Sequence, residues 1–310
     1  MVTGLPPVAL IAGPTASGKS ALALTLAERT GGVVINADSA QLYRDLPILS
    51  AAPSPAERAR TEHRLYGVRD GAEPCSAAEW AGMAKAEIAA LHAEGRLPIL
   101  VGGTGLYLRT LIAGIAPVPP IAPAVREELR RTSVAENFAR LIILDPVGAA
   151  SLHPGDTTRI ARALEVALST GKTLKAWQAE EHGGIGETIA LRPLILLPPR
   201  DWLYERCDLR FAEMVDGGAR REVEALAARK LDPKLPVMRA IGVTDLIALA
   251  TGEKSEVEAI AAGQQATRRY AKRQYTWFVN QPPPDWPRFT EPLDSPQAID
   301  AALALLEIES

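Results

Sequence analysis

The sequence predicts an α/β protein in which helices flank a central parallel sheet and a small helical domain is inserted. Short apolar runs typical of strands alternate with longer helix-like runs in the N-terminal part. A glycine-rich turn joins the first strand to the first helix. A proline-rich segment, 117–123, then interrupts the alternation and precedes a mostly helical stretch.

The elements follow in a clear order along the chain. We expect strands at 8–12, 33–36 and 98–101 and helices at 20–29, 76–93 and 105–113. The stretch 124–187 reads as helical, an apolar strand at 188–197 rejoins the sheet, and long helices continue to Asn280. The expected domains are therefore a catalytic core with C-terminal helices, 1–120 and 188–310, and a helical insertion, 121–187.

The glycine-rich turn matches the P-loop pattern G-x-x-x-x-G-K-[ST], set between a strand and a helix. Its two glycines let backbone N–H groups converge on phosphate oxygens at a helix N-terminus. The lysine adds a full charge, and the serine hydroxyl is suited to Mg²⁺ carried by a phosphorylated ligand. The core is therefore predicted to be P-loop NTPase-like, with a diphosphate or nucleotide held by Gly13, Pro14, Thr15, Ala16, Ser17, Gly18, Lys19 and Ser20.

A metal-binding carboxylate is missing where nucleotide-hydrolysing P-loop proteins usually have one. The apolar run 97–101 continues into Gly102-Gly103-Thr104-Gly105 with no acid at its tip. This absence favours a bound pyrophosphate that is a leaving group rather than part of a nucleotide.

Composition bounds the protein class. The chain has 310 residues, a 47% hydrophobic fraction and a net charge of −3, so any nucleic-acid surface has to be local. No apolar run approaches the roughly 18 residues of a membrane span, and the segment 1–7 lacks the features of a signal peptide. Cys75 and Cys207 match no metal spacing. We expect a cytoplasmic protein.

Two residues follow predicted strands and therefore meet at one sheet edge. Asp38, after the second strand, is a candidate general base or substrate-orienting acid, or else the cap of a helix beginning at Ser39. Thr104 is a candidate site residue or the cap of the helix that follows it.

Two predicted helices carry basic residues in patterns that could contact nucleic acid. Arg159 and Arg162 lie away from the apolar stripe formed by Ile160, Ala163, Leu164, Ala167 and Leu168, on a solvated or a phosphate-contacting face. In the segment 267–278, basic residues alternate with aromatic ones, which is typical of an RNA-binding strip or of a helix with a buried aromatic side.

Taken together, these segments resemble the tRNA dimethylallyltransferases, also called tRNA isopentenyltransferases, over nearly the whole chain. That family transfers the dimethylallyl group of dimethylallyl diphosphate to N6 of adenosine 37, beside the tRNA anticodon, with Mg²⁺ and with release of diphosphate. The resemblance rests on ordered motifs: Gly13–Ser20, Asn36–Tyr43, Gly102–Tyr107, Leu144–Pro146, Asp156 with Arg159–Val166, Arg239–Gly242 and Thr267–Trp277.

The resemblance implies roles for individual residues. Asp38 would accept the N6 proton, Lys19 and Arg210 would stabilise the departing diphosphate, and Ser20 would lie beside Mg²⁺. The partners would be the tRNA anticodon stem-loop and dimethylallyl diphosphate, with no membrane, and the enzyme a monomer. The implied tRNA contacts are Asp38, Ser39, Ala40, Gln41, Thr104, Arg126, Arg159, Ile160, Ala161, Arg162, Ala163, Arg239, Ala240, Ile241, Gly242, Val243, Lys272, Arg273, Gln274, Tyr275, Thr276, Trp277 and Phe278.

Two other functions use the same residues. A P-loop kinase of a small metabolite would bind ATP in the same loop, with Asp38 orienting a substrate hydroxyl. A non-enzymatic RNA-binding protein would bind tRNA through the basic strip and turn nothing over.

Overall fold

The computed structural model describes residues 4–308. We expect no signal peptide in the segment 1–7, and residues 1–3 of that segment lie outside the described residues. The chain forms two compact units. Unit 1 comprises Met1–Leu111 and Gly186–Ser310, and unit 2 comprises Ile112–Ile185. The proline-rich segment 117–123 lies inside unit 2, several residues beyond the point where that unit begins.

Unit 1 is built on a six-stranded sheet in the order β3-β2-β4-β1-β7-β8, and every pairing in it is parallel. The predicted α/β fold is confirmed, and the strand expected at 188–197 does rejoin the sheet, beside the first strand. Two strands of two residues each, β3 and β8, were not predicted. The strands are β1 (Pro7–Ala12), β2 (Val33–Asn36), β3 (His63–Arg64), β4 (Pro98–Gly102), β7 (Ala190–Leu196) and β8 (Arg288–Phe289).

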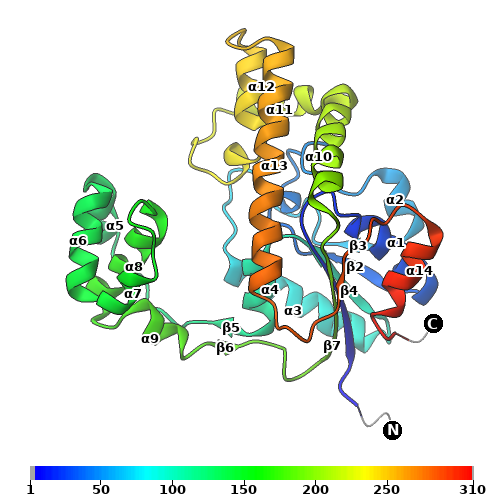
Figure 1. The fold of residues 1–310 in the computed structure, drawn as a ribbon, viewed down its shortest axis with the longest axis horizontal. Helices are drawn as coiled ribbons and strands as arrows, with labels where there is room; N and C mark the ends of the chain where they lie inside the picture. The colour runs from blue at the N-terminus through cyan, green and yellow to red at the C-terminus, as the bar shows by residue number, and fades with distance from the viewer. Residues whose placement is uncertain (1–3, 309–310) are drawn as a thin grey trace. The chain divides into compact units, whose positions relative to one another are not determined.

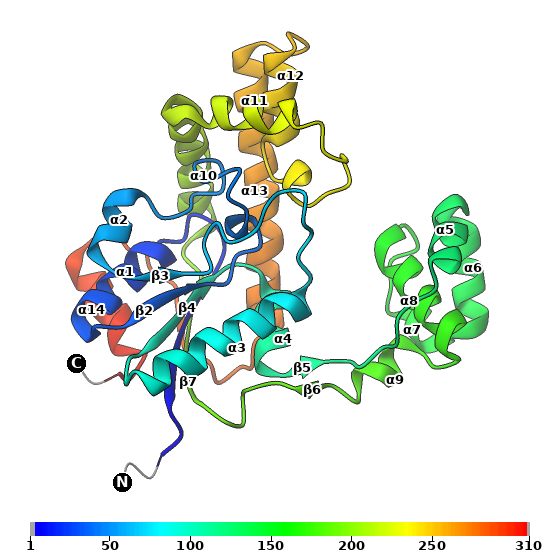
Figure 2. The same ribbon diagram turned by 180° about the vertical axis from the view of Figure 1, so that it is seen from behind.

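Helices cover both faces of this sheet, as Figures 1 and 2 show. On one face, α1 (Lys19–Thr30) and α14 (Pro296–Ala304) pack on alternate residues of the central strands, including Ile11, Val101 and Leu196. The intervening strand residues, such as Leu10 and Leu100, are fully buried toward the other face. On that face α3 (Ala77–Ala93) packs on β2 and β4, and Tyr107 of α4 (Gly105–Ile112) stacks on Trp80 of α3.

The C-terminal helices of unit 1 include a long pair, α10 (Arg200–Met214) and α13 (Glu256–Asn280), that run side by side (Figure 1). A capping box at Ser255 starts α13, and Pro282 follows its C-cap Gln281. The remaining helices of the unit are α2 (Pro55–Arg60), α11 (Arg220–Ala228) and α12 (Val243–Ala250), with short turns η1 (Ala40–Leu42), η2 (Val215–Ala219) and η3 (Val237–Arg239).

Unit 2 is a helical bundle with its own hydrophobic core. Its centre contains Leu129, Leu141, Ile160 and Leu164, so much of the predicted apolar stripe is confirmed, although Leu168 is 39% exposed. The elements are β5 (Gly114–Ile115), α5 (Pro123–Arg131), α6 (Val134–Leu144), α7 (Pro146–Ala150), α8 (Thr157–Thr170), α9 (Leu174–Gln178) and β6 (His182–Gly183), with β5 and β6 paired antiparallel.

The parallel sheet determines where a site can form in unit 1. The P-loop, the Asp38 loop and the Gly102–Gly105 turn follow β1, β2 and β4, and these strands are neighbours or next neighbours in the sheet. Their carboxyl ends therefore bring all three loops to one edge. Among the described residues, no helix is long and apolar enough to cross a membrane.

Candidate active site

The P-loop forms the turn between β1 and α1. Gly18 is the N-cap of α1 with a left-handed backbone (φ +93°), which favours glycine, and no side chain caps this helix. The first amides of α1 are therefore left for an anion. Ser17 adds a buried hydroxyl that has no hydrogen-bond partner among the described atoms. Both features fit a phosphate site.

Lys19 places a buried charge in this loop. Its side chain is buried, and Nζ donates a hydrogen bond to the Pro14 carbonyl oxygen at 3.1 Å. Burial is the main cause that lowers its pKa from 10.5 to about 8, and the Asp38 carboxylate opposes this shift. A cation held away from water without a close carboxylate partner is suited to an anionic ligand.

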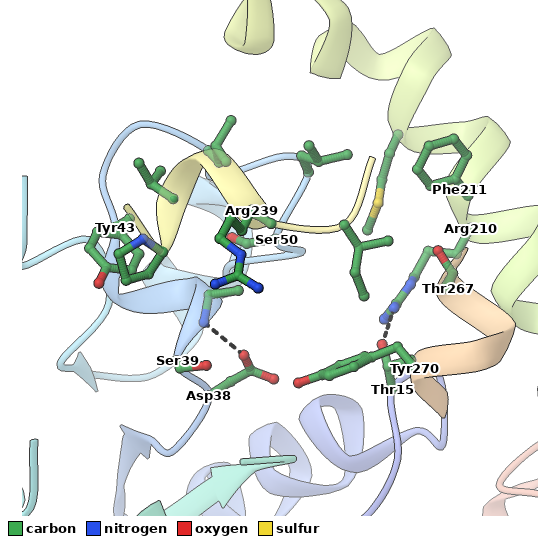
Figure 3. A pocket seen from close by; sticks show the side chains of 18 of the residues that line it. Thr15, Asp38, Ser39, Tyr43, Ser50, Arg210, Phe211, Arg239, Thr267 and Tyr270 are labelled. Atoms are coloured by element: carbon green, nitrogen blue, oxygen red, sulfur yellow. Dashed lines mark hydrogen bonds between the residues drawn. The ribbon is translucent and has the colours of Figure 1, made fainter. Parts of the chain in front are cut away.

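Asn36 at the end of β2 shapes the loop that carries Asp38. Asn36 Oδ1 accepts from the Asp38 N–H at 2.7 Å, and its Nδ2 donates to the Asp38 and Leu65 carbonyl oxygens, both at 3.0 Å. Asp38 Oδ1 in turn accepts from the Ala40 N–H at 3.0 Å. Asp38 therefore holds the first amide of the η1 turn, whose N-cap is Ser39, and, as Figure 3 shows, also presents its carboxylate to the cavity.

Thr104 ties two of the loops together. Its Oγ1 accepts from the Ser39 N–H at 3.0 Å. Its backbone carbonyl accepts from the Tyr107 and Leu108 N–H groups, so Thr104 also stands at the cap position of α4. The neighbouring turn approaches the Asp38 loop so closely that a Cβ on Gly102 would lie 2.1 Å from the Ala37 carbonyl oxygen. Glycine is therefore required at this position.

Two arginines of α10 contact the P-loop from outside the sheet. Arg210 donates to Thr15 Oγ1, and Arg206 Nε donates to the Ala16 carbonyl oxygen at 3.2 Å. Burial lowers the pKa of Arg210, which is half-buried at the cavity wall. The predicted Arg210 therefore lies beside the P-loop, where its charge adds to that of Lys19.

Thr15, Asp38 and Arg210 line a cavity of about 230 Å³ (Figure 3). Tyr270 of α13 points toward Asp38 across it, and burial together with the Asp38 charge raises the pKa of its hydroxyl. Sequence reasoning missed Tyr270 and the apolar wall. The polar lining includes Thr15, Asp38, Ser39, Arg210, Arg239 and Tyr270, and the apolar lining includes Leu46, Leu49, Phe211, Met214, Val237 and Ile241.

The residues predicted to contact tRNA in unit 1 separate into exposed and buried groups. Arg239, Ala240 and Ile241 line the cavity, and Lys272, Arg273 and Thr276 are exposed on α13. Four other predicted positions in unit 1 are buried. The buried residues are Gly242, Val243, Gln274 and Phe278.

The aromatic residues at the end of α13 make packing contacts. The Trp277 ring lies so close that a Cβ on Gly105 would be 2.4 Å from it. Tyr275 lies beneath the Arg200 guanidinium, 4.8 Å from the ring centroid.

The predicted contacts beside Asp38 lie in a turn. Ala40 and Gln41 belong to the η1 turn, and Gln41 Nε2 donates to the Ala51 carbonyl oxygen at 2.8 Å.

Unit 2 carries the remaining predicted contacts. Arg126 and Arg162 each pair with Glu165 at 3.6 Å, and Arg159 pairs with Asp156 at the same distance. Ala161 is half-buried. Ile160 and Ala163 lie in the core of the unit, so their side chains face away from solvent.

A metal ion would depend on the ligand for most of its coordination. Among residues 4–308, no cluster of three His, Cys, Asp or Glu side chains is placed to bind a metal. Ser20 lies exposed in the first turn of α1 and offers one hydroxyl. One hydroxyl fits Mg²⁺ that arrives on phosphate oxygens and keeps several waters.

The fold and the cavity together define an α/β protein with a P-loop-like core, in which part of the P-loop, a carboxylate and an apolar wall line one cavity. The IPP transferase family model matches residues 41–281. A tRNA dimethylallyltransferase of Sphingopyxis alaskensis is 58% identical over 301 residues, covering 97% of this chain and 98% of that protein. One of Erythrobacter litoralis is 61% identical over 288 residues, covering 91% of each. The chain therefore belongs to the IPP transferase family.

Solved structures agree with this membership. The full-length tRNA isopentenylpyrophosphate transferase of Bacillus halodurans matches with a TM-score of 0.70 and 31% identity, covering 98% of this chain and 97% of that one. A eukaryotic dimethylallyltransferase acting on tRNA matches with a TM-score of 0.76 and 29% identity, covering 88% of this chain and 70% of that one.

Proposed function

We propose that the protein transfers the dimethylallyl group of dimethylallyl diphosphate to N6 of adenosine 37 of tRNA and releases diphosphate. The observation that carries this proposal is the composition of the cavity. Thr15 of the P-loop and Arg210 line one side, Asp38 lines another, and an apolar wall is available to a five-carbon chain. Lys19 lies buried within the same P-loop. The names of the relatives support the same reaction.

The geometry suggests a role for each group. The N6 lone pair attacks the allylic C1 as the C1–O bond breaks, and the bonding electrons leave with the diphosphate. Lys19, Arg210 and the P-loop amides stabilise the charge that develops on that leaving group. Asp38 orients the amine and takes the N6 proton. Mg²⁺, when bound near Ser20, neutralises further diphosphate charge.

RNA recognition is proposed for the exposed cations. Lys272 and Arg273 on α13, and Arg126, Arg159 and Arg162 in unit 2, would contact phosphates of the anticodon stem-loop. The target adenine would leave its stack to reach the cavity. We propose that the enzyme acts as a monomer in the cytoplasm, which agrees with its two free cysteines.

One experiment tests the activity. Purified protein is incubated with dimethylallyl diphosphate, Mg²⁺ and unmodified tRNA, and nuclease fragments are weighed by mass spectrometry. We expect one dimethylallyl group on the nucleoside 3′ of the anticodon, and none with Lys19→Ala. Added mass elsewhere would reject the assigned position.

The same preparation separates the alternatives. ATP should compete poorly with dimethylallyl diphosphate, because no strand-end carboxylate beside β4 holds a nucleotide-bound metal. Tight ATP binding with phosphoryl transfer would favour the kinase. Binding of tRNA with no product from either donor would favour a non-enzymatic RNA-binding protein.

A further inference from the structure

Helix α13 presents two different faces near its C-terminal end. Lys272 and Arg273 are exposed, whereas the next residue, Gln274, is only 6% exposed. Because successive helix residues are rotated by about 100° around the axis, neighbouring residues of this segment lie on the exposed and on the buried face of α13. Gln274 therefore differs from its neighbours in what it can contact.

The Gln274 carboxamide joins two loops of the site. Its Oε1 accepts from the Thr15 N–H at 2.8 Å, and its Nε2 donates to the Gly103 carbonyl oxygen at 2.8 Å. Both partners are backbone groups of fixed polarity, so they also fix which end of the amide is oxygen. A Cβ on Gly103 would lie 2.2 Å from Nε2, which shows how closely the amide fits over that turn.

Thr15 is held from two directions as a result. Gln274 of α13 takes its backbone N–H, and Arg210 of α10 donates to its hydroxyl. Thr15 and Arg210 both line the cavity (Figure 3). The position of this part of the P-loop is therefore set by a buried amide on α13, the same helix whose outer face carries Lys272 and Arg273.

We infer that Gln274 is a positioning residue of the diphosphate site rather than a contact to tRNA. It fixes the P-loop and the Gly103 turn relative to each other, so that Thr15 and Arg210 are both placed to contact the leaving group. This inference rests on the proposed function, since it assigns the P-loop to the diphosphate of the donor. Removing the amide leaves the Thr15 N–H and the Gly103 carbonyl unpaired, which favours other loop conformations.

The test uses the full-length enzyme and Gln274→Met, which keeps the length of the side chain but has no amide. We expect affinity for inorganic pyrophosphate with Mg²⁺, measured by calorimetry, to fall by about 10- to 100-fold. Affinity for unmodified tRNA should change by less than about twofold, and the KM for dimethylallyl diphosphate should rise while the KM for tRNA does not. Gln274→Glu provides a second variant, because one oxygen still accepts from Thr15 while the other opposes the Gly103 carbonyl.

Gln264→Met is the matched control on the same helix. Gln264 Nε2 donates to the Asp208 carbonyl oxygen at 3.0 Å. This variant therefore removes a side-chain hydrogen bond of α13 as well, but one made to α10 rather than to the P-loop. It should lower the melting temperature without changing pyrophosphate affinity. The inference is overturned if Gln274→Met weakens tRNA binding alone, or if it lowers only the melting temperature. Failure of the unmodified enzyme to bind pyrophosphate would instead reject the diphosphate site itself, and this inference with it.

Discussion

Tyr270 and Asp38 face one another across the cavity, although 232 residues of sequence numbering separate a helix of the C-terminal half from a loop after β2. One Asp38 oxygen is held by the Ala40 N–H. Burial and the Asp38 charge raise the pKa of the Tyr270 hydroxyl above its ordinary value, so a neutral phenol faces the carboxylate. The carboxylate is therefore oriented by the protein before any amine arrives.

Asp38→Asn tests whether this carboxylate takes a proton. The amide oxygen still accepts from the Ala40 N–H, so the loop and the melting temperature should hardly change. An amide does not accept the N6 proton, and we expect turnover to fall by roughly 10²–10⁴. Single-turnover rates with dimethylallyl diphosphate and tRNA give the measurement. Near-normal turnover combined with a much lower melting temperature would leave Asp38 only its role as a turn cap.

Lys19→Met should stabilise the protein while abolishing prenyl transfer. Burial lowers the Lys19 pKa from 10.5 to about 8, so charging Lys19 costs the folded state on the order of 3 kcal/mol below pH 8. Methionine avoids that cost. Denaturant unfolding at pH 7 should show a free energy of unfolding higher by up to this amount.

The pH dependence of that gain has a definite sign. The folded state releases the Lys19 proton at a lower pH than the unfolded chain, so the wild-type protein gains stability as pH rises from 8 to 10.5. The difference between Lys19→Met and wild type should therefore close over this range. A constant difference, or a less stable variant, would contradict a costly buried charge.

The outer face of α13 gives a prediction about salt. Arg268 is paired with Asp208 of α10, so we expect the RNA-facing charge to come from Lys272 and Arg273. Replacing both by Ala should reduce the slope of log affinity against log salt by roughly 0.7–0.9 for each phosphate that is no longer neutralised. Filter binding of tRNA at several salt concentrations measures this slope. Arg268→Ala should alter stability more than the slope, and an unchanged slope in the double variant would identify a solvated face.

The fold was accessible to sequence reasoning wherever a pattern is local. Short apolar runs predicted β1, β2, β4 and β7, because each strand buries apolar residues within a few positions. The strands β3 and β8 have two residues each, and their pairing depends on neighbours that are distant in the sequence. No short pattern indicates such strands.

The site residues, too, could be predicted from the sequence only where the pattern is local. The P-loop and Asp38 follow strands directly, whereas Tyr270 and Phe211 reach the cavity only because α10 and α13 pack together. Gln274 was grouped with the charged residues beside it. The buried residues Thr267, Ala271, Gln274 and Phe278 recur at intervals of four, three and four, which is the inner face of a helix. That spacing was the available signal that Gln274 faces inward.

Glu165 gives the last prediction, in unit 2. Its side chain is 12% exposed and pairs with both Arg126 and Arg162, each at 3.6 Å. If these arginines contact tRNA phosphates, the carboxylate fixes their positions and also offsets part of their charge. Glu165→Gln separates the two effects, because it removes the charge and keeps the shape.

We expect fixed geometry to dominate, so that Glu165→Gln weakens tRNA binding by about 3- to 10-fold although the variant is more positive by one charge. Glu128→Gln is the matched control, since Glu128 pairs with Arg140 at 2.8 Å in the same unit and gives the same charge change. It should bind tRNA as tightly as wild type or slightly more tightly. Tighter binding by both variants would mean that Glu165 only neutralises charge, and that Arg126 and Arg162 need no partner to contact RNA.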